Sequence, residues 1–227
     1  MGGGRDSRIP SILNEWFGAH GPDVRVVVRT YDFHPDRAGE QIDVWYEELR
    51  PELVIGESMG AVHALALLTQ KSKAGAGSAA PAFPLLLVSP ALNGPVYFYR
   101  LRALTRIPGI RRLFNRIYKP REGERQAIDF RYASMAAWPR HRDDALSAAS
   151  LIPKDDSRGG QPAKAQSPAR IHAFFGRRDH YRRSGVVSIR QWREKFGPGS
   201  YTLYDGSHYM EEEHLTALLI PAILERI

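Results

Sequence analysis

Apolar residues near the start of the chain recur with the period of a helix. Ile9, Ile12, Leu13, Trp16 and Phe17 follow the i, i+3, i+4, i+7, i+8 spacing of one helix face. Ser7 precedes this face and is a candidate cap. Residues 42–49 repeat the pattern and end before Pro51. Two amphipathic helices are therefore predicted in the first 50 residues.

Other segments have the composition of strands. Residues 24–31 are rich in β-branched side chains, and residues 53–57 and 83–88 hold short apolar runs. Two further runs follow, one ending at Gly176 and one at Tyr204, and helical patterns cover 186–192 and 215–227. Strands that alternate with helices predict an α/β fold, a mostly parallel sheet flanked by helices.

The most informative stretch is the turn between a strand and a helix at residues 56–60. Its sequence is Gly56-Glu57-Ser58-Met59-Gly60, a Gly-x-Ser-x-Gly pattern. A serine in such a turn has a strained backbone and an exposed hydroxyl, and we expect side chains at the two glycines to collide with neighbouring backbone. The Met59 N–H would lie at a helix N-terminus, where a negative oxygen is favoured.

This pattern calls for an acid and then a histidine, each after a later strand. Asp179 follows the run that ends at Gly176, and His208 follows the run that ends at Tyr204. With these motifs, the chain resembles the α/β-hydrolase superfamily over roughly residues 24–70, 84–92 and 170–227. The resemblance implies Ser58 as nucleophile, His208 as base and Asp179 as the acid that orients the base.

Each of these roles has a competing residue. Asp205 lies close to His208 in sequence, but we expect it to shape the turn. His63 lies on the helix after Ser58 and is interpreted as structural. Met59 would supply one oxyanion-hole donor, and Gly2 or Gly3 the second.

The resemblance also raises a question about the N-terminus. Members of the superfamily place a strand ending in His-Gly before the first helix, between the strands predicted here at 24–31 and 53–57. Gly2-Gly3-Gly4 resembles the end of the loop that follows that strand. We therefore expect an N-terminal truncation. The alternative is a natural short form in which the two predicted strands pair directly.

Residues 94–150 have helical patterns and no strand-like run, so we predict a helical cap inserted into a core of residues 1–93 and 151–227. Basic residues outnumber acidic ones by nine to two in 96–125. The basic residues are Arg100, Arg102, Arg106, Arg111, Arg112, Arg116, Lys119, Arg121 and Arg125. This charge would attract an acidic substrate or an anionic membrane surface, or it is only a solvated helix face.

Composition narrows the classes of function. The 227 residues include no cysteine, which excludes disulfides, thiolate metal sites and cysteine nucleophiles. No His/Asp/Glu cluster has metal-ligand spacing, and we expect no metal and no cofactor. No apolar run has the length of a membrane span, and we expect a cytoplasmic protein. The net charge of +7 is compatible with an anionic partner, although we expect no nucleic acid.

These observations predict a serine hydrolase that cleaves a small carboxylic ester or thioester through an acyl-enzyme. The alternative is a catalytically weak or inactive protein of the same fold that binds an anionic ligand, a membrane surface or a partner through its basic cap. The oligomeric state is left open.

Overall fold

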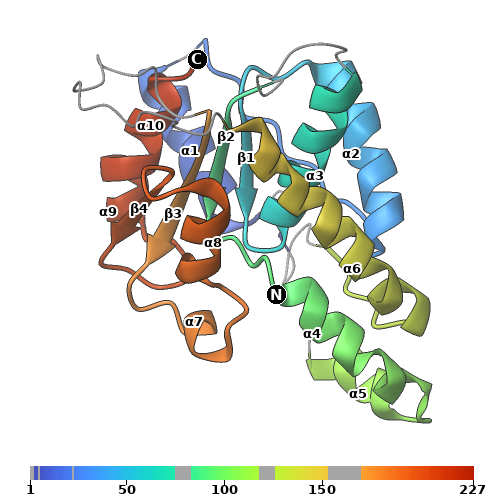
Figure 1. Ribbon diagram of the computed structural model, residues 1–227. Helices are drawn as coiled ribbons and strands as arrows, with labels where there is room; N and C mark the ends of the chain where they lie inside the picture. The colour runs from blue at the N-terminus through green and yellow to red at the C-terminus, as the bar shows by residue number, and fades with distance from the viewer. Residues whose placement is uncertain (1–2, 5, 22, 75–82, 118–125, 153–169) are drawn as a thin grey trace.

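The computed structural model describes residues 3–4, 6–21, 23–74, 83–117, 126–152 and 170–227. Four parallel strands form one sheet in the order β1-β2-β3-β4: β1 (Val54–Glu57), β2 (Leu85–Val88), β3 (Ile171–Gly176) and β4 (Tyr201–Tyr204) (Figure 1). Val54 pairs with Leu85, and Leu85 in turn pairs with Ile171. The α/β class predicted from the sequence is confirmed.

Helical segments occupy most of the described chain between and after the strands. They are α1 (Arg8–His20), α2 (Pro35–Leu49), α3 (Gly60–Ala74), α4 (Gly94–Leu101), η1 (Arg102–Arg106), α5 (Ile110–Ile117), α6 (Tyr132–Leu146), η2 (Ser147–Leu151), α7 (Tyr181–Ser184), α8 (Ile189–Phe196), α9 (Glu212–His214), η3 (Leu215–Leu219) and α10 (Ile220–Leu224). The helices predicted around Ile9–Phe17 and 42–49 are confirmed as α1 and α2.

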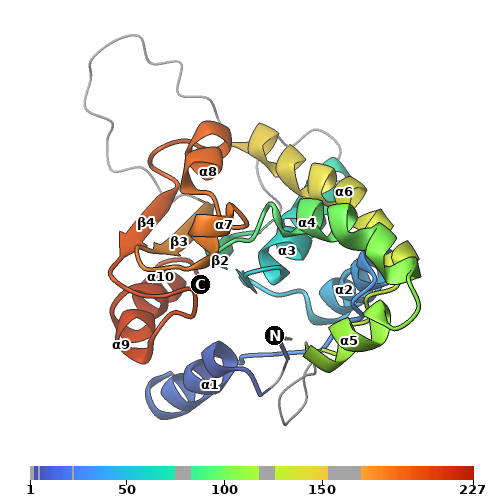
Figure 2. The same cartoon turned by 90° about the horizontal axis from the view of Figure 1, so that it is seen from below.

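The sheet is covered on both faces, which explains why β2 is apolar at every position. Leu85 and Leu87 point into a cluster with residues of α3, α6 and α8. Leu86 and Val88 point into a second cluster with residues of α1 and the C-terminal helices. Alternate side chains of a strand point to opposite faces, so a strand buried on both faces needs apolar residues throughout. Figure 2 shows the two helical layers on either side of the sheet.

The strand predicted at 24–31 is wrong. These residues have no regular secondary structure, and β1 forms an edge of the sheet among the described residues. Val24 and Val26 still pack, partly buried, against the same cluster as Ile55. β-Branched composition favours a pleated, half-buried surface, but a strand also needs a neighbour for its backbone hydrogen bonds. Direct pairing of 24–31 with the strand before Ser58 does not occur.

The described parts of residues 94–151 are helical except at 107–109 and 126–131, and they contain no strand. α6 packs along α3, whereas α4 and α5 extend beyond the carboxyl ends of the strands (Figure 1). Rings of Phe33, Phe98, Phe130 and Trp138 contact one another and tie these helices to the segment before α2. The division into a core of 1–93 and 151–227 and a cap of 94–150 stays a prediction.

Composition also predicts two surface connections, a Gly/Ala/Ser/Lys loop at 71–81 and a polar segment at 154–169. α3 continues to Ala74, so Lys71 is helical and pairs with Asp43 and Glu47. The segment 154–169 lies outside the described residues. Within the described chain, no helix has the length and apolar character needed to cross a bilayer. A cytoplasmic location stays a prediction.

Candidate active site

The turn after β1 has the strained geometry that its sequence predicts. Ser58 adopts a left-handed conformation, with φ of 54°, in a region that non-glycine residues seldom occupy. The Ser58 N–H donates to the Val88 carbonyl (2.9 Å), and the Ser58 carbonyl accepts from the Ala91 N–H (3.1 Å). These bonds tie the turn to the end of β2. The strain at Ser58 is therefore held by the sheet.

The two glycines of this turn are needed for different reasons. A Cβ at Gly56 would lie 2.8 Å from the Ala61 Cα, a collision with backbone, as predicted. A Cβ at Gly60 would lie 3.3 Å from the Tyr31 hydroxyl, which is a side chain. The predicted backbone collision at Gly60 is therefore wrong, because α3 turns that position toward Tyr31.

Ser58, His208 and Asp179 lie together although they are far apart in sequence. His208 Nε2 lies 3.0 Å from Ser58 Oγ, and His208 Nδ1 lies 2.8 Å from Asp179 Oδ2. The His208 and Asp179 residues are only 2% and 3% exposed. The three side chains form a continuous hydrogen-bonded path from a buried carboxylate to a serine hydroxyl.

The loops after β3 and β4 interlock and so fix Asp179 and His208. A Cβ at Gly176 would lie 2.1 Å from the Ser207 carbonyl oxygen, so only glycine permits this approach. The Arg178 N–H donates to the Gly206 carbonyl (2.9 Å). Asp179 Oδ1 accepts from the Tyr181 N–H (2.8 Å), which holds the second oxygen toward His208. The Tyr181 ring packs edge-on against the imidazole, with ring centroids 4.6 Å apart.

Asp205 and two other histidines near these loops, His172 and His180, take no part in this hydrogen-bonded path. The Asp205 side chain is 77% exposed and pairs with Arg178, at 3.3 Å. His172 bonds to Thr202 (2.9 Å), and burial lowers its pKa to about 4. The His180 ring packs at a tilt against Tyr181, with ring centroids 4.1 Å apart, and lies 6.0 Å from the His208 ring.

The structure describes only two of the three residues predicted to form the oxyanion hole, Met59 and Gly3. Met59 directly precedes α3, so its N–H lies at the N-terminus of that helix. The Gly3 carbonyl accepts from the Gln126 N–H (2.8 Å), which ties the start of the chain to the segment before α6. Gly2 lies outside the described residues. The donor roles of Met59, Gly2 and Gly3 stay predictions.

Comparison with known proteins gives structural neighbours only. No family model and no curated protein matches the chain. Among solved structures, a provisionally assigned hydrolase from Agrobacterium vitis S4 has a TM-score of 0.53 and 16% identity, over 98% of this chain and 84% of that one. The chain has an α/β-hydrolase-like fold.

Two of the other matching structures have lower TM-scores. A monoacylglycerol lipase from Paleococcus ferrophilus has a TM-score of 0.49 and 14% identity, over 87% of this chain and 80% of that one. A structure from a study of two metagenome-derived lipolytic enzymes has a TM-score of 0.45 and 12% identity, over 95% and 86%. The identities are low, so the roles of individual residues in this α/β-hydrolase-like fold rest on its own geometry.

The sequence analysis did not predict a buried contact between histidine rings of α3 and α6. The His63 ring, on α3, lies 4.6 Å from the His141 ring of α6 and 4.7 Å from the Tyr31 ring, centroid to centroid. Both His63 ring nitrogens are buried, and neither has a hydrogen-bond partner among the described residues. Burial, and secondarily His141, holds the pKa of His63 well below its usual value. His63 is thus a neutral core residue, in line with its predicted structural role. No sequence signal links it to His141.

The side chains that the structure describes do not form a metal-binding group. No group of three or more His, Asp or Glu there could hold an ion. The arrangement around Ser58 instead places a hydroxyl, an imidazole and a carboxylate in series. Such a series can withdraw a proton from the hydroxyl and stabilise the resulting imidazolium.

Proposed function

We propose that this chain is a serine hydrolase that cleaves a small carboxylic ester or thioester through an acyl-enzyme. The observation that carries the proposal is the hydrogen-bonded path from Asp179 through His208 to Ser58, at 2.8 and 3.0 Å. The strained turn supports it, because a left-handed serine held by the sheet presents its hydroxyl in one fixed place.

The reaction would follow from these positions. His208 Nε2 takes the Ser58 proton as Oγ attacks the carbonyl carbon, and the carbonyl oxygen becomes negative. As the C–O or C–S bond breaks, the same proton passes to the departing alkoxide or thiolate, which leaves Ser58 acylated. Water, deprotonated by His208, then releases the acid and restores the serine.

The other residues would act on charge and orientation. Asp179 holds the imidazole with Nε2 toward Ser58 and offsets the imidazolium charge. The Met59 N–H, at the N-terminus of α3, would donate to the oxyanion. Burial of His208 and Asp179 excludes competing water and strengthens the pair electrostatically.

Hydrolysis of p-nitrophenyl butyrate and of a butyryl thioester tests the proposal. Ser58→Ala should lower kcat on the order of 10⁴- to 10⁶-fold for both substrates. Ser11→Ala, on α1, is the matched control and should keep wild-type rates. If the folded Ser58→Ala protein retained activity within tenfold of wild type, the serine mechanism would be ruled out.

A second candidate function is binding to an anionic membrane surface. Large apolar side chains of the α4–α5 region are 39–61% exposed: Tyr99, Leu101, Leu104, Ile107, Leu113 and Ile117. Arg111, Arg112 and Arg116 are exposed on the same helix as the last two. A helix with exposed apolar and basic residues suits the interface of a bilayer with anionic headgroups.

Sedimentation with phosphatidylglycerol vesicles separates this candidate from a merely solvated face. Leu113→Glu with Ile117→Glu should reduce the bound fraction several-fold. Val44→Glu, a 63% exposed position on α2, should not change it. Wild-type protein that stays in the supernatant at low ionic strength, where such attraction is strongest, would exclude membrane binding.

A further inference from the structure

The loop that carries His208 is held by a carboxylate outside the path from Asp179 to Ser58. Glu211 follows His208 on the same loop and directly precedes α9. Its carboxylate accepts the Ser207 N–H, at 3.2 Å to Oε1 and 3.4 Å to Oε2, and the Ser207 hydroxyl, at 2.7 Å to Oε1. Glu211 therefore holds the residue immediately before the proposed base.

The Ser207 carbonyl has a partner of its own. The Tyr204 hydroxyl, at the end of β4, donates to it (3.1 Å), and Tyr204 is 4% exposed. Burial raises the pKa of Tyr204, so the hydroxyl keeps its proton and stays a donor. The N–H, the hydroxyl and the carbonyl of Ser207 are thus all engaged, and the peptide group that joins Ser207 to His208 is held in place.

Gly206 lies between these two supports. A Cβ at this position would collide with the Tyr204 ring and would lie 2.5 Å from Glu211 Oε2. The aromatic ring and the carboxylate therefore approach the backbone of the loop so closely that only a residue without a side chain fits between them.

Glu211 also joins this loop to the C-terminal helices. Its carbonyl accepts the N–H groups of His214 (3.0 Å) and Leu215 (2.9 Å). Leu215 is 0% exposed and belongs to the cluster that packs on one face of the sheet. The backbone position of Glu211 is thus set by the core, and its side chain transmits that position to Ser207.

The charge of Glu211 strengthens the contact with Ser207. Burial alone would raise the pKa of Glu211, but hydrogen bonds, chiefly those from Ser207, outweigh burial and hold the pKa below its ordinary value. Glu211 is therefore ionised at neutral pH. Hydrogen bonds to an ionised acceptor are roughly twice as strong as those between neutral groups, so a glutamine of the same length would hold Ser207 less firmly.

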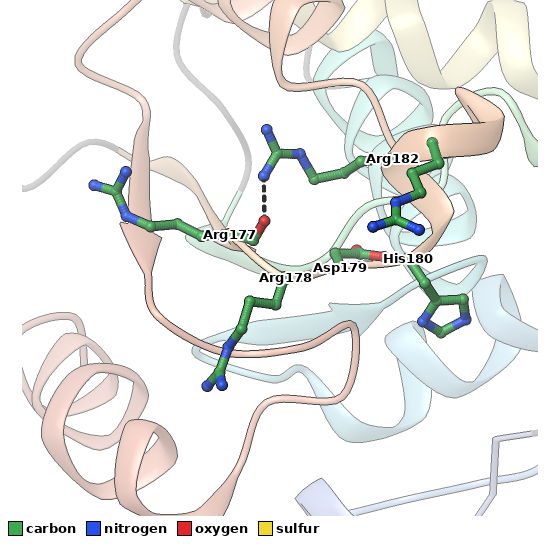
Figure 3. A pocket seen from close by; sticks show the side chains of 6 residues that line it. Arg177, Arg178, Asp179, His180 and Arg182 are labelled. Carbon is green, nitrogen blue, oxygen red and sulfur yellow. Dashed lines mark hydrogen bonds between the residues drawn. The ribbon is translucent and has the colours of Figure 1, made fainter.

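The turn around Asp179 supports the His208 loop at a more distant point. Arg178 donates from Nη2 to the Asp205 carbonyl (2.8 Å) and pairs with the Asp205 carboxylate (3.3 Å). Figure 3 shows the Arg178 side chain extending away from Arg177. The side chains of Arg178 and Asp205 are 67% and 77% exposed, and exposed ion pairs contribute little. The bonds at Ser207 are nearer to His208 and less exposed.

We propose that Glu211 is a positioning residue for His208. Its carboxylate holds Ser207, and through Ser207 it keeps the imidazole in the orientation that bonds to both Asp179 and Ser58. The inference rests on the serine-hydrolase proposal, because the role it assigns to Glu211 belongs to that reaction. Glu211 acts through the loop and not on the substrate.

Steady-state hydrolysis of p-nitrophenyl butyrate tests this role. Glu211→Gln keeps the length of the side chain but not its charge, so we expect kcat to fall about tenfold with KM within about twofold of wild type. Glu211→Ala removes every bond to Ser207 and should lower kcat about 100-fold. Tyr204→Phe removes only the donor to the Ser207 carbonyl and should have an effect no larger than that of Glu211→Gln.

Glu212→Gln is the charge-matched control. Glu212 is the exposed first residue of α9, next to Glu211 in sequence. This variant should keep wild-type kcat and KM. If Glu211→Ala does not fold, Glu211→Gln, which has nearly the same size, carries the test.

The tautomer of His208 separates positioning from a general loss of structure, because it reports the ring itself and needs no turnover. NMR of protein labelled with ¹⁵N-histidine, with the signal assigned by its absence in His208→Ala, measures the tautomer at pH 8. Wild type and Glu212→Gln should show the Nδ1–H form that bonds to Asp179. Glu211→Gln and Glu211→Ala should show a mixture of both tautomers.

Three results would overturn the positioning role. They are kcat within twofold of wild type in both Glu211 variants, an equal loss of kcat in Glu212→Gln, and a loss of kcat in the Glu211 variants with the wild-type tautomer unchanged. A mixture of tautomers in wild type would overturn it as well.

The two proposals fail in different ways. Full ester hydrolysis by the Glu211 variants would remove the positioning role and leave the hydrolase proposal standing. Absence of ester hydrolysis by wild type, with a tautomer that depends on Glu211, would remove the hydrolase proposal and leave the hold of Glu211 on His208 standing.

Discussion

The turns after β1 and β3 lie at the same end of the sheet and both depend on a glycine, yet they differ in character. The turn at Ser58 is packed against backbone and followed by a buried apolar helix. The turn at Asp179 interlocks with the His208 loop and is followed and preceded by exposed arginines, four within residues 177–183. The first turn holds the proposed nucleophile, Ser58, in place. The second turn carries both the proposed acid, Asp179, and a positively charged surface.

The largest predicted effect that tests this comparison is the loss of kcat on substitution of Asp179. Asp179→Asn should lower kcat on the order of 10⁴-fold, because an amide cannot hold the same imidazole tautomer or offset its charge. Asp205→Asn, on the neighbouring loop, should stay within about twofold. Steady-state hydrolysis of p-nitrophenyl butyrate measures both. If Asp179→Asn kept activity within tenfold, another carboxylate would have to orient His208, and the second turn would lose its proposed role.

A second prediction compares the glycines. Gly176→Ala would place a Cβ 2.1 Å from the Ser207 carbonyl oxygen and force apart the loops that carry Asp179 and His208. We expect a loss of about 2–4 kcal/mol in unfolding free energy, the scale of severe overpacking, and a large loss of activity.

Gly60→Ala serves as the milder comparison for this change. Its Cβ would lie 3.3 Å from the Tyr31 hydroxyl, which can move. Alanine also has a higher helix propensity than glycine. Urea unfolding should show a change of about 1 kcal/mol or less. Equal losses at Gly60 and Gly176 would contradict the interlocked-loop description.

A smaller effect concerns the helix after the Ser58 turn. Burial lowers the pKa of His63 in the folded protein, whereas an unfolded histidine titrates near its ordinary value of about 6.5. Below about pH 6.5 the unfolded state therefore binds more protons than the folded state, and stability falls as pH falls. His63→Phe should remove this contribution, which is at most about 1.4 kcal/mol per pH unit.

Urea unfolding at pH 8 and pH 5 checks this prediction. His141 and Tyr31 are the titratable groups packed against His63, and both remain in the variant. Any overpacking by phenylalanine acts equally at both pH values, so the difference between them isolates the titration. An unchanged pH dependence would mean that His63 binds the same number of protons in the folded and unfolded states, so that burial does not lower its pKa.

Sequence reasoning succeeded where one local requirement decides the structure. The Ser58 turn needs its glycine at position 56 and its strained serine, and both appear in the residue pattern. The order Ser58, Asp179, His208 follows from the strands that end before each residue. The three side chains meet because parallel strands bring their carboxyl ends to one edge of the sheet.

It failed where structure depends on distant partners. Residues 24–31 have strand composition, but no strand of the described chain pairs with them, and composition alone does not show whether a partner strand is present. The His63–His141 contact joins two helices with no shared motif. The four arginines of 177–183 are visible in the sequence, yet the pairing of Arg178 with Asp205 depends on how the turn after β3 meets the loop after β4. Short helix α7, four residues long, is also too brief for a periodic signal.

Labelling with a fluorophosphonate tests the central claim most directly, because the reagent reacts with a serine only when its proton is withdrawn. Intact-mass measurement and peptide mapping should show one adduct per chain, on Ser58. Ser58→Ala should give none, and His208→Ala should react slower by orders of magnitude. A folded wild-type protein that stays unlabelled, or an adduct on a different residue, would contradict the account.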